Sequence, residues 1–517
     1  MHHPILTLSN LLDGIIVAGC LPELEVTGLA LDTRVLVAGE VFVAVGGLSR
    51  SAQSLVGQAI EKGASCVLLE AEDKSKHGVA TVDHNVYVVQ LYGLKSRVGE
   101  IFARFYMPAI SGLPLYGVTG TNGKTSVAYF IAQLFTLLTG AAQGVIGTLG
   151  RGSINELSGS SHTTPDLASI YAALTSMRER GFASVSMEVS SHALDQGRVS
   201  GLPFRVCIFT NLSRDHLDYH ETMEKYAAAK ELLFRLNPLA SPVINIDDTF
   251  GQLIFDRLNV NQRATVISYG IENHAARLQA TSLTFGLDGV SGVIRFDGVE
   301  KPFQSSLMGE FNVLNLLAAI AVPLAEGIDL DAVVACIEKL KPVPGRMEKV
   351  VCSPYKSCAE MEPEQAAKDR SPLVIVDYAH TPDALDNALR ALKKHSAADL
   401  WCVFGCGGDR DKGKRPLMGA AAASLADRLV ITSDNPRSEK PAAIIEDILA
   451  GVGDVANVVT ETNREKAICY AIESAGNDDV LLLAGKGHED YQEANGKRIY
   501  FSDVDCARQA LSRRVLA

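Results

Sequence analysis

Short apolar runs that alternate with helix-type patterns fill the middle of this sequence. The runs at residues 113–118, 183–187, 206–210 and 242–246 are mostly apolar, which is typical of strands buried on both faces. Apolar residues recur at helical spacing between several of them, so we expect a mostly parallel sheet with helices on both faces. Residues 283–303 predict a β insertion with glycine turns, and residues 311–324 predict a helix.

The two flanking regions repeat this alternation on a smaller scale. Strand-like runs at 35–45, 65–70 and 86–91 and helical patterns at 52–62 and 94–106 predict a small α/β domain, with a joint at Pro108 and the Ser111-Gly112 pair. A second joint lies at 342–345. Beyond it, strands at 373–378, 400–404, 428–433 and 480–484 alternate with helices, as in a doubly wound, Rossmann-like sheet. The polar stretch at 351–372 reads as a surface loop or an insertion.

A length of 517 residues suits three domains with separate cores. We predict an α/β protein with a small N-terminal domain at 1–110, a central domain at 111–341 and a C-terminal domain at 342–517. A net charge of −12 argues against nucleic acid or an anionic membrane as the main partner. The sequence shows no signal-peptide pattern, and its longest apolar run, near 313–325, is too short for a bilayer. We therefore expect a cytoplasmic protein without membrane insertion.

The spacing of the cysteines argues against a zinc site. The ten residues of this type are scattered without paired CxxC spacing, which favours reduced, mostly buried thiols over a zinc site.

The strongest chemical signal follows the strand at 113–118. The sequence GTNGKTS, residues 120–126, joins this strand to a helical pattern. Its glycines allow a tight turn that points N–H groups inward, and the helix start adds the positive end of its dipole. Lys124 can reach the β- and γ-phosphates of a nucleotide, and the Thr125 hydroxyl can join a Mg²⁺ shell. Val118 stands where the common phosphate-loop pattern has glycine, so this is a variant form. The alternative is a glycine-rich turn that binds nothing.

Polar residues also follow other strands of the central region. Glu188, after the 183–187 strand, could face the nucleotide as a Mg²⁺ ligand, or it could be a capping or surface residue. The segment TNLSRDHLDYH, residues 210–220, places His216 beside Asp215 and reads as a site rather than as core. Lys230, in the segment YAAAK, reads by itself as a solvated charge.

Three polar turns follow strands of the C-terminal region. They are residues 404–416 with four cations and four glycines, the DNPR turn at 434–437, and GKGHED at 485–490. Each alone could be only a turn. Since all three follow strands of one predicted sheet, we expect a common pocket there, and the first turn suits an anion.

Ten segments in chain order resemble those of the Mur ligases, the ATP-dependent amide-forming enzymes of peptidoglycan assembly: GTNGKT, MEVSSHALDQGR, TNLSRDHLDYH, YAAAK, GEFNVLNLLAA, GRME, VDYAHTPDAL, GCGGDRDKGKRP, DNPR and GKGHEDY. The resemblance covers nearly the whole chain. It implies a UDP-binding, a central P-loop and a C-terminal Rossmann-like domain. It also implies that meso-diaminopimelate is added to UDP-N-acetylmuramoyl-L-alanyl-D-glutamate through an acyl phosphate, with ATP as co-substrate. We expect a monomer whose partners are these small molecules.

The resemblance also implies roles for individual residues. Thr125 and Glu188 would hold one Mg²⁺, while His216 and a Lys230 carbamylated by CO₂ would serve a second beside Lys124. Contacts to ATP are expected from Gly120, Thr121, Asn122, Gly123, Lys124, Thr125, Ser126, Asn312, Arg346 and Asp377. Contacts to the UDP-linked substrate are expected from Leu31, Thr33, Thr163, Thr164, Ser190, Gln196 and Arg198. Contacts to diaminopimelate are expected from Arg410, Asp434, Asn435, Pro436, Arg437, Gly485 and Glu489.

The charges of the last set suit meso-diaminopimelate. Arg437 can fork onto its distal carboxylate, and Glu489 can meet its ammonium group. L-lysine lacks that carboxylate and would leave the arginine unpaired, a mismatch that can reject an analogue by ~10⁴-fold. One segment departs from the family pattern, because GLSRSA stands where the uridine loop often carries His-Gln or Asp-Gly. We therefore assign no side-chain role to Leu48 or Ser49.

Three alternatives remain open. A lysine-adding Mur ligase is disfavoured by Arg437, and a ligase like folylpolyglutamate synthase is disfavoured by the LDTR segment and the DNPR turn. A nucleotide-sensing protein without turnover is disfavoured by the combination of Lys124, Glu188, His216 and Lys230.

Overall fold

The structure, a computed structural model, describes residues 6–16, 21–46, 51–159, 162–258, 265–351, 371–395, 398–453 and 457–516. It divides into two compact units, Met1–Leu278 with Leu317–Asp329 and Gln279–Leu316 with Leu330–Ala517. The predicted domain limits at residues 110 and 341 stay predictions. Most of the predicted loop at 351–372 lies outside the described residues. Within the described segments, no helix is both long and apolar enough to cross a membrane.

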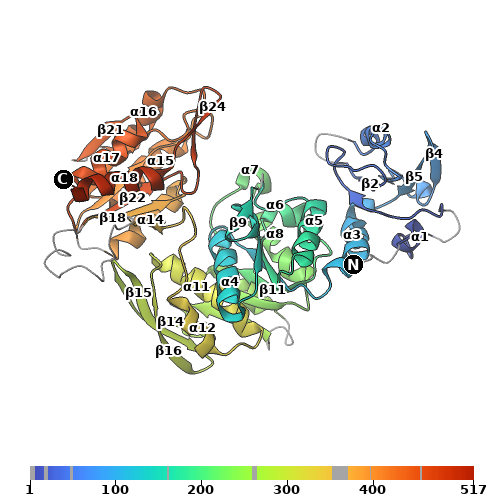
Figure 1. Cartoon of the computed structure of the whole chain (residues 1–517), viewed down its shortest axis with the longest axis horizontal. Coiled ribbons are helices and arrows are strands. Elements are labelled where there is room, and N and C mark those ends of the chain that lie inside the picture. Colours follow the sequence, from blue (N-terminus) through green and yellow to red (C-terminus); the bar gives the residue numbers. More distant parts are fainter. Residues whose placement is uncertain are drawn as a thin grey trace. The chain divides into compact units, whose positions relative to one another are not determined.

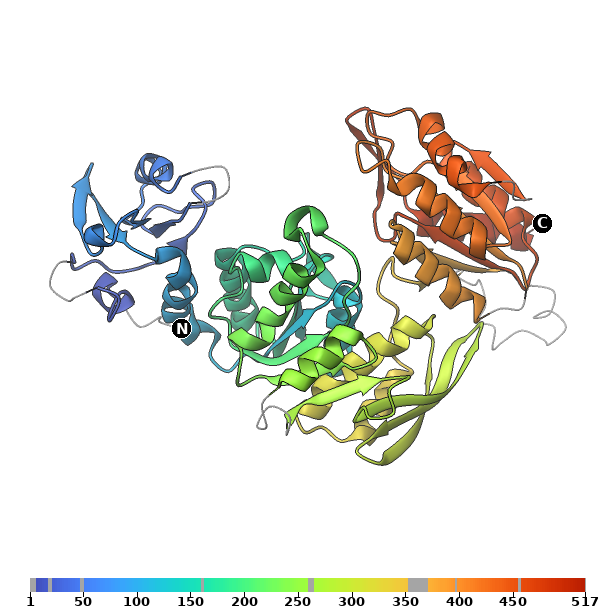
Figure 2. The same cartoon turned by 180° about the vertical axis from the view of Figure 1, so that it is seen from behind.

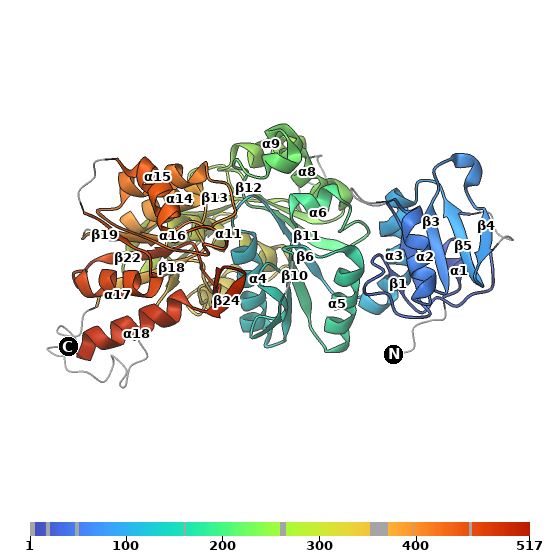
Figure 3. The ribbon, with the colours of Figure 1, turned by 90° about the horizontal axis from the view of Figure 1, so that it is seen from above.

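The N-terminal part of the first unit contains a five-stranded sheet in the order β1-β2-β3-β5-β4 (Figure 3). Its strands are β1 (Leu29–Ala30), β2 (Val41–Ala44), β3 (Cys66–Glu70), β5 (Val86–Leu91) and an antiparallel edge strand, β4 (Ala80–Asp83). The short helix α1 (Leu8–Leu11) precedes the sheet, and α2 (Gln53–Glu61) and a 3₁₀ turn at Lys74–Lys76 lie between its strands along the chain. The strand predicted at 35–45 is wrong in its first half, because residues 35–40 form turns around Gly39 (φ +94°).

The helix α3 (Leu94–Ile110) continues through Pro108, where we expected a joint. Proline cannot donate to the carbonyl four residues earlier and its ring crowds that carbonyl. The helix ends two residues after it. The helix packs against α5 (Leu167–Glu179) through stacked rings, with Tyr106 and Tyr171 centroids 5.1 Å apart.

The central sheet of the first unit holds its parallel strands in the order β13-β12-β11-β6-β10-β7. Figure 1 shows this part of the chain in cyan and green. The bounds of these strands are β6 (Leu115–Thr119), β7 (Gln143–Gly147), β10 (Ser184–Glu188), β11 (Phe204–Phe209), β12 (Ser241–Asn245) and β13 (Ile267–Gly270). The antiparallel strands β8 (Gly150–Ser153) and β9 (Glu156–Ser158) extend one edge. The helices along this part of the chain are α4 (Lys124–Thr139), α5, α6 (Ser191–Asp195), α7 (Leu217–His220), α8 (Met223–Leu236) and α9 (Thr249–Arg257).

The register of this sheet positions the candidate site. Glu188 pairs with Val118 and Phe209 pairs with Thr119, so β10, β6 and β11 end at the same level. The polar segments that follow these three strands therefore meet at one edge.

The second unit begins with the predicted β insertion, formed by β14 (Leu278–Gly286), β15 (Gly289–Phe296) and β16 (Val299–Ser305). The helix α11 (Glu310–Ala325) follows, with its residues from Leu317 on belonging to the first unit, and α12 (Leu330–Ile337) comes next in the second unit. A six-stranded sheet then runs in the order β17-β18-β22-β19-β20-β21, parallel except at β17. Its strands are β17 (Glu348–Lys349), β18 (Leu373–Asp377), β19 (Leu400–Phe404), β20 (Arg428–Thr432), β21 (Val458–Glu461) and β22 (Val480–Ala484).

Helices cover both faces of this sheet (Figure 2). One core joins it to α14 (Pro382–Lys393), α15 (Lys414–Leu425) and α16 (Pro441–Val452), and the other to α17 (Arg464–Ser474) and α18 (Asp503–Leu516). A hairpin of β23 (Tyr491–Ala494) and β24 (Lys497–Tyr500) follows β22. The predicted α/β class with mostly parallel sheets is confirmed. The described cysteines are free and all but Cys469 are buried, as predicted for reduced thiols.

Candidate active site

The loop of residues 120–126 makes a tight turn into α4. Gly120 has φ +151°, and a Cβ there would lie 1.8 Å from the hydroxyl of Thr210, so only glycine fits. Gly123 has φ +85° at the N-cap of the helix. Lys124 folds back over the loop, and its Nζ donates to the carbonyl oxygens of Gly120 (2.9 Å) and Thr121 (2.8 Å). The predicted strand, loop and helix are therefore all present, with the lysine on the loop.

The first residues of the 210–220 segment brace this loop. The amide of Thr121 donates to the carbonyl of Asn211 at 2.8 Å, and the amide of Asn122 donates to the Asn211 side chain at 2.9 Å. The Thr210 hydroxyl donates to the carbonyl of Asn122 at 2.6 Å, and the amide of Ser213 donates to the Thr121 hydroxyl at 3.0 Å. The polar residues of this segment, which we interpret as part of a site, thus also fix the loop of residues 120–126.

Glu188 is buried, with 1% of its surface exposed, which rules out the surface alternative. Its Oε2 accepts from the hydroxyls of Thr125 (2.9 Å) and Thr148 (3.2 Å), and its Oε1 accepts from the amide of Thr148 (2.7 Å). Sequence reasoning missed Thr148. The sequence signal for Thr148 was its position directly after the apolar run that forms β7. Gly147 precedes it, and a Cβ on that glycine would lie 2.1 Å from the Glu188 carboxylate.

Lys230 is buried rather than solvated, with 1% of its surface exposed. Its Nζ donates to the carbonyl of Gly120 at 2.7 Å and lies 4.2 Å from the centre of the Tyr226 ring. Burial, and then the nearby charge of Lys124, holds the pKa of Lys230 well below its usual value. Both effects favour the neutral form of this amine over the charged form.

His216 lies beside the same tyrosine. It has a left-handed backbone (φ +53°) before α7, and its ring centroid lies 6.0 Å from that of Tyr226. Burial lowers the pKa of His216, with Asp215 opposing and the charges of Lys124 and Lys230 adding to the shift. His192 and His220, which sequence reasoning did not select, complete a ring cluster, with His192 4.9 Å from His216 and 5.3 Å from His220.

The residues predicted for the UDP-linked substrate fall into two groups within the first unit. Thr164 donates to the carbonyl of Glu188 (2.8 Å) and accepts from the amide of Ser190 (3.0 Å), while Arg198 donates to the carbonyl of Thr164 (3.0 Å) and to Gln196. Thr163 contacts the Thr148 hydroxyl at 3.1 Å, so it belongs with them. Leu31 and Thr33 lie in the N-terminal part, where Thr33 donates to Gln58. Leu48 and Ser49 lie outside the described residues.

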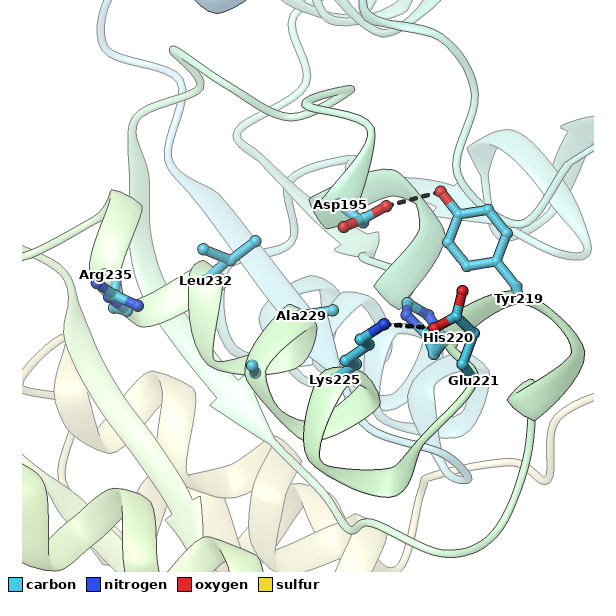
Figure 4. A pocket seen from close by; sticks show the side chains of 9 residues that line it. Asp195, Tyr219, His220, Glu221, Lys225, Ala229, Leu232 and Arg235 are labelled. Atoms are coloured by element: carbon cyan, nitrogen blue, oxygen red, sulfur yellow. Dashed lines mark hydrogen bonds and ion pairs between the residues drawn. The ribbon is translucent and has the colours of Figure 1, made fainter. Parts of the chain in front are cut away.

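An open pocket of about 540 Å³ lies along α8 (Figure 4). Tyr219 points toward Asp195 and donates to its carboxylate at 2.7 Å, and the Tyr219 hydroxyl also accepts from Gln196 at 3.1 Å. Lys225 pairs with Glu221 at its rim. Tyr219 thus connects this pocket to Gln196, one of the residues predicted for the UDP-linked substrate.

The residues predicted for the amino acid gather in the second unit. Asn435 donates to the carboxylate of Glu489 at 2.9 Å. Asp434 is 7% exposed, its Oδ1 has no hydrogen-bond partner in the described part of the chain, and burial raises its pKa. A Cβ on Gly485 would lie 3.1 Å from the other oxygen of Asp434. Lys486, which we had not selected, is fully buried here, 3.4 Å from Glu489 and 3.8 Å from Asp434.

Arg437 sits beside this cluster in a left-handed conformation (φ +50°). Its Nη1 donates to the carbonyl of Gly408 at 2.8 Å, and its Nε lies 3.6 Å from Glu493. A Cβ on Gly407 would lie 3.0 Å from that Nη1 and 3.6 Å from Cγ of Arg410, so both arginines flank Gly407. Pro436 lies in the same turn, where its carbonyl accepts from the amide of Glu439.

The three remaining ATP candidates belong to the second unit. Asp377 accepts from the amides of Met347 (2.7 Å) and Ala379 (2.8 Å), and burial raises its pKa. The Arg346 guanidinium lies 4.6 Å from the Tyr378 ring, and its buried Nε has no hydrogen-bond partner among the described residues. The Asn312 side chain is buried and donates to the carbonyl of Met308.

No group of three or more histidine, cysteine, aspartate or glutamate side chains in the described segments is arranged to hold a metal by itself. A metal at this site would therefore take ligands of other kinds, such as the Thr125 hydroxyl and substrate oxygens.

Comparison with known proteins places these features in a family. Residues 118–323 match the Mur ligase middle domain and residues 362–487 match the Mur ligase, glutamate ligase domain. The UDP-N-acetylmuramoyl-L-alanyl-D-glutamate–2,6-diaminopimelate ligase of Pseudomonas aeruginosa is 43% identical over 490 residues, covering 95% of this chain and 96% of the relative. That of Neisseria meningitidis serogroup B is 42% identical over 486 residues, covering 93% and 94%.

Comparison with solved structures supports the same family assignment. A structure of a UDP-N-acetylmuramoyl-L-alanyl-D-glutamate–2,6-diaminopimelate ligase superposes with a TM-score of 0.74 at 35% identity, covering 99% of both chains. A folylpolyglutamate synthase from Mycobacterium tuberculosis shares only the fold, with a TM-score of 0.56 at 18% identity over 80% of this chain and 94% of that one. The chain belongs to the Mur ligase family and is an ATP-dependent, ADP-forming ligase.

Proposed function

We propose that this protein joins an amino group of meso-diaminopimelate to the γ-carboxylate of D-glutamate in UDP-N-acetylmuramoyl-L-alanyl-D-glutamate. The single observation that carries the choice of amino acid is Arg437 beside the Asp434–Asn435–Glu489 cluster. This arrangement offers a cation for a second carboxylate and anions for an ammonium group. The high-coverage relatives named for this reaction support the same choice.

The reaction needs ATP because a carboxylate does not react with an amine near neutral pH. Transfer of the γ-phosphoryl group to the carboxylate gives an acyl phosphate, and attack by the amine then expels phosphate. Catalysis of such a transfer depends on positioning and on charge neutralisation. Lys124 supplies one charge at the loop, and the braced backbone of residues 120–123 holds the phosphates in place.

The residues around the loop fit a magnesium ion. The Thr125 hydroxyl and the buried Glu188 carboxylate lie 2.9 Å apart, and the partners of this carboxylate are two hydroxyls and an amide, all neutral. Hard oxygen ligands of this kind suit Mg²⁺. Bound Mg²⁺ would neutralise charge on the transferring phosphoryl group.

Lys230 fits the proposed carbamate. A neutral amine is the form that adds to CO₂, with formation of an N–C bond and release of one proton, and the buried position of Lys230 favours that form. The resulting anion would find Lys124 close by and, together with His216, could hold a second Mg²⁺. We also propose that the protein acts in the cytoplasm as a monomer.

One assay tests this function. Phosphate release is measured with ATP, Mg²⁺ and the UDP-linked dipeptide, adding diaminopimelate, L-lysine or L-glutamate in turn. We expect release with diaminopimelate at a rate far above that with the other two. Release that prefers lysine would make the protein a lysine-adding ligase, and release that prefers glutamate would favour a ligase like folylpolyglutamate synthase. Release with none of them would favour a nucleotide-sensing protein.

A further inference from the structure

A buried ion pair ties together the two loops that carry Arg410 and Arg437. Arg415, near the start of α15, has a fully buried side chain. Its guanidinium forks onto Glu439, with Nη1 3.0 Å from Oε2 and Nη2 2.8 Å from Oε1. Arg415 follows the loop after β19, and Glu439 lies in the loop after β20, so the pair fixes one loop against the other.

Both members of the pair also hold backbone. Nη2 of Arg415 donates to the carbonyl of Gly407 at 3.3 Å. Oε1 of Glu439 accepts from the amide of Asp409 at 2.7 Å. The Asp409 carboxylate in turn accepts from the amide (3.1 Å) and hydroxyl (2.6 Å) of Ser438. Because a two-pronged arginine–carboxylate contact fixes orientation as well as distance, the register between the loops is well defined.

The orientation of Arg437 depends on this framework. Its Nη1 donates to the carbonyl of Gly408, whose amide donates to the carbonyl of Asn435 at 2.9 Å. Arg437 and Asp409 both have left-handed backbones, with φ +50° and +54°. Such conformations persist in non-glycine residues only where surrounding contacts hold them. The contacts that hold them here include those of Glu439.

We propose that Arg415 and Glu439 are a positioning pair that orients Arg437, and that the pair thereby sets the preference for an amino acid with a second carboxylate over L-lysine. The inference rests on the proposed function. Arg415 has no exposed side chain with which to touch a substrate, and the Glu439 carboxylate is occupied by Arg415, Lys412 and the loop backbone. The pair therefore acts through Arg437.

Steady-state kinetics of Glu439→Gln test this role, because the substitution keeps the size of the side chain and removes its charge. We expect the KM for diaminopimelate to rise about tenfold or more. The kcat at saturating diaminopimelate and the KM values for ATP and the UDP-linked dipeptide should stay within about twofold, because the loop at residues 120–126 belongs to another part of the chain. The ratio of kcat/KM for diaminopimelate to that for L-lysine should fall. Arg415→Lys, which keeps the charge but not the fork, should change the same quantities in the same direction.

Asp447→Asn is the matched control. Asp447 accepts from Nη1 of the same arginine at 2.8 Å but lies on α16, outside both loops, and it should leave the diaminopimelate KM within about twofold. The proposal is overturned if both pair variants keep the wild-type KM and the wild-type ratio, or if kcat and all three KM values shift together with the melting temperature. If the wild-type protein releases no phosphate with diaminopimelate, the proposed function is overturned. The proposed role of the pair in selecting this amino acid is then overturned as well.

Discussion

The side-chain nitrogen of Lys230 and that of Lys124 share one acceptor, the carbonyl oxygen of Gly120, at 2.7 and 2.9 Å. Two lysine amines so close together cannot both carry a charge without repulsion, and burial disfavours the charge on Lys230 further. The protein thus places an amine whose neutral form is favoured against the Gly120 carbonyl of the loop at residues 120–126. A carbamate at that position would convert the repulsion into an ion pair with Lys124.

Replacing Lys230 with alanine should remove most of the ligase activity. Short carboxylic acids such as acetate should restore part of it, because a small anion can occupy the space where the carbamate oxygens would lie. The measurement is phosphate release as a function of added acid.

Lys225→Ala serves as the control, because Lys225 lies on the same helix but is exposed and paired with Glu221. It should keep near wild-type activity. Full activity of unrescued Lys230→Ala would remove the carbamate from the mechanism.

Replacing Arg437 with alanine should raise the KM for diaminopimelate by about 10- to 100-fold, the effect of losing one charge-assisted contact worth about 1.5–3 kcal/mol. The KM for ATP should change little. Arg390→Ala, which removes an exposed arginine paired within α14, is the control. Equal losses in the use of both substrates would contradict a role of Arg437 in amino-acid recognition.

The sequence was sufficient to predict the loop at 120–126 and the polar edge of the central sheet. Parallel strands bring their carboxyl ends together, so the apolar runs before Glu188 and before residue 210 already indicated one site. Thr148 could not be predicted in the same way. Its contact with Glu188 depends on β7 lying next to β10. The order of strands in a sheet cannot be deduced from the local pattern of apolar and polar residues.

The burial of several charged side chains was not predicted from the sequence either. Lys230, Lys486 and Arg415 have no exposed side-chain surface or almost none, yet lysine and arginine in a sequence read first as solvated groups. Their burial follows from partners that lie far away in the sequence, such as Gly120 for Lys230 and Glu439 for Arg415. Only the resemblance to a family selected Lys230, and Arg415 entered the sequence analysis only as one of four cations in a turn that suits an anion.

His395 provides a pH-dependent contribution to stability. It is 5% exposed, its Nε2 accepts from the amide of Gly309 at 2.9 Å and its Nδ1 contacts the carbonyl of Gly286 at 2.7 Å, so the ring is neutral. Burial lowers the pKa of His395 below its ordinary 6.5, and the Gly286 carbonyl only partly opposes this. The unfolded chain therefore binds this proton more readily, and the contribution to stability is complete above about pH 6.5 and declines as the pH falls below it.

We expect His395→Asn to be less stable than wild type at about pH 7.5, by ~1 kcal/mol for the lost Gly309 contact. The difference should shrink toward pH 5, because only the wild type loses stability through this group. Melting temperatures of both proteins across this range measure it. His84→Asn, at an exposed histidine, is the control. A difference that does not change with pH would contradict the neutral, buried state of His395.

The fully buried pair of Arg464 and Asp503 should be the most costly ion pair to break. Both side chains are 0% exposed, and two hydrogen bonds of 2.7 and 2.6 Å join them. Arg464→Met leaves the aspartate buried without its cation, which should lower the free energy of unfolding by about 3–5 kcal/mol. Arg464→Met combined with Asp503→Leu should recover part of this loss, because the unpaired Asp503 charge is removed while the carbonyls of Ser433 and Ala484 still lose a donor. Arg428→Met breaks the half-exposed pair with Asp399 and should cost only ~0–1 kcal/mol. Urea unfolding of the three variants measures these differences, and an Arg464→Met protein as stable as Arg428→Met would show that the carboxylate finds another partner.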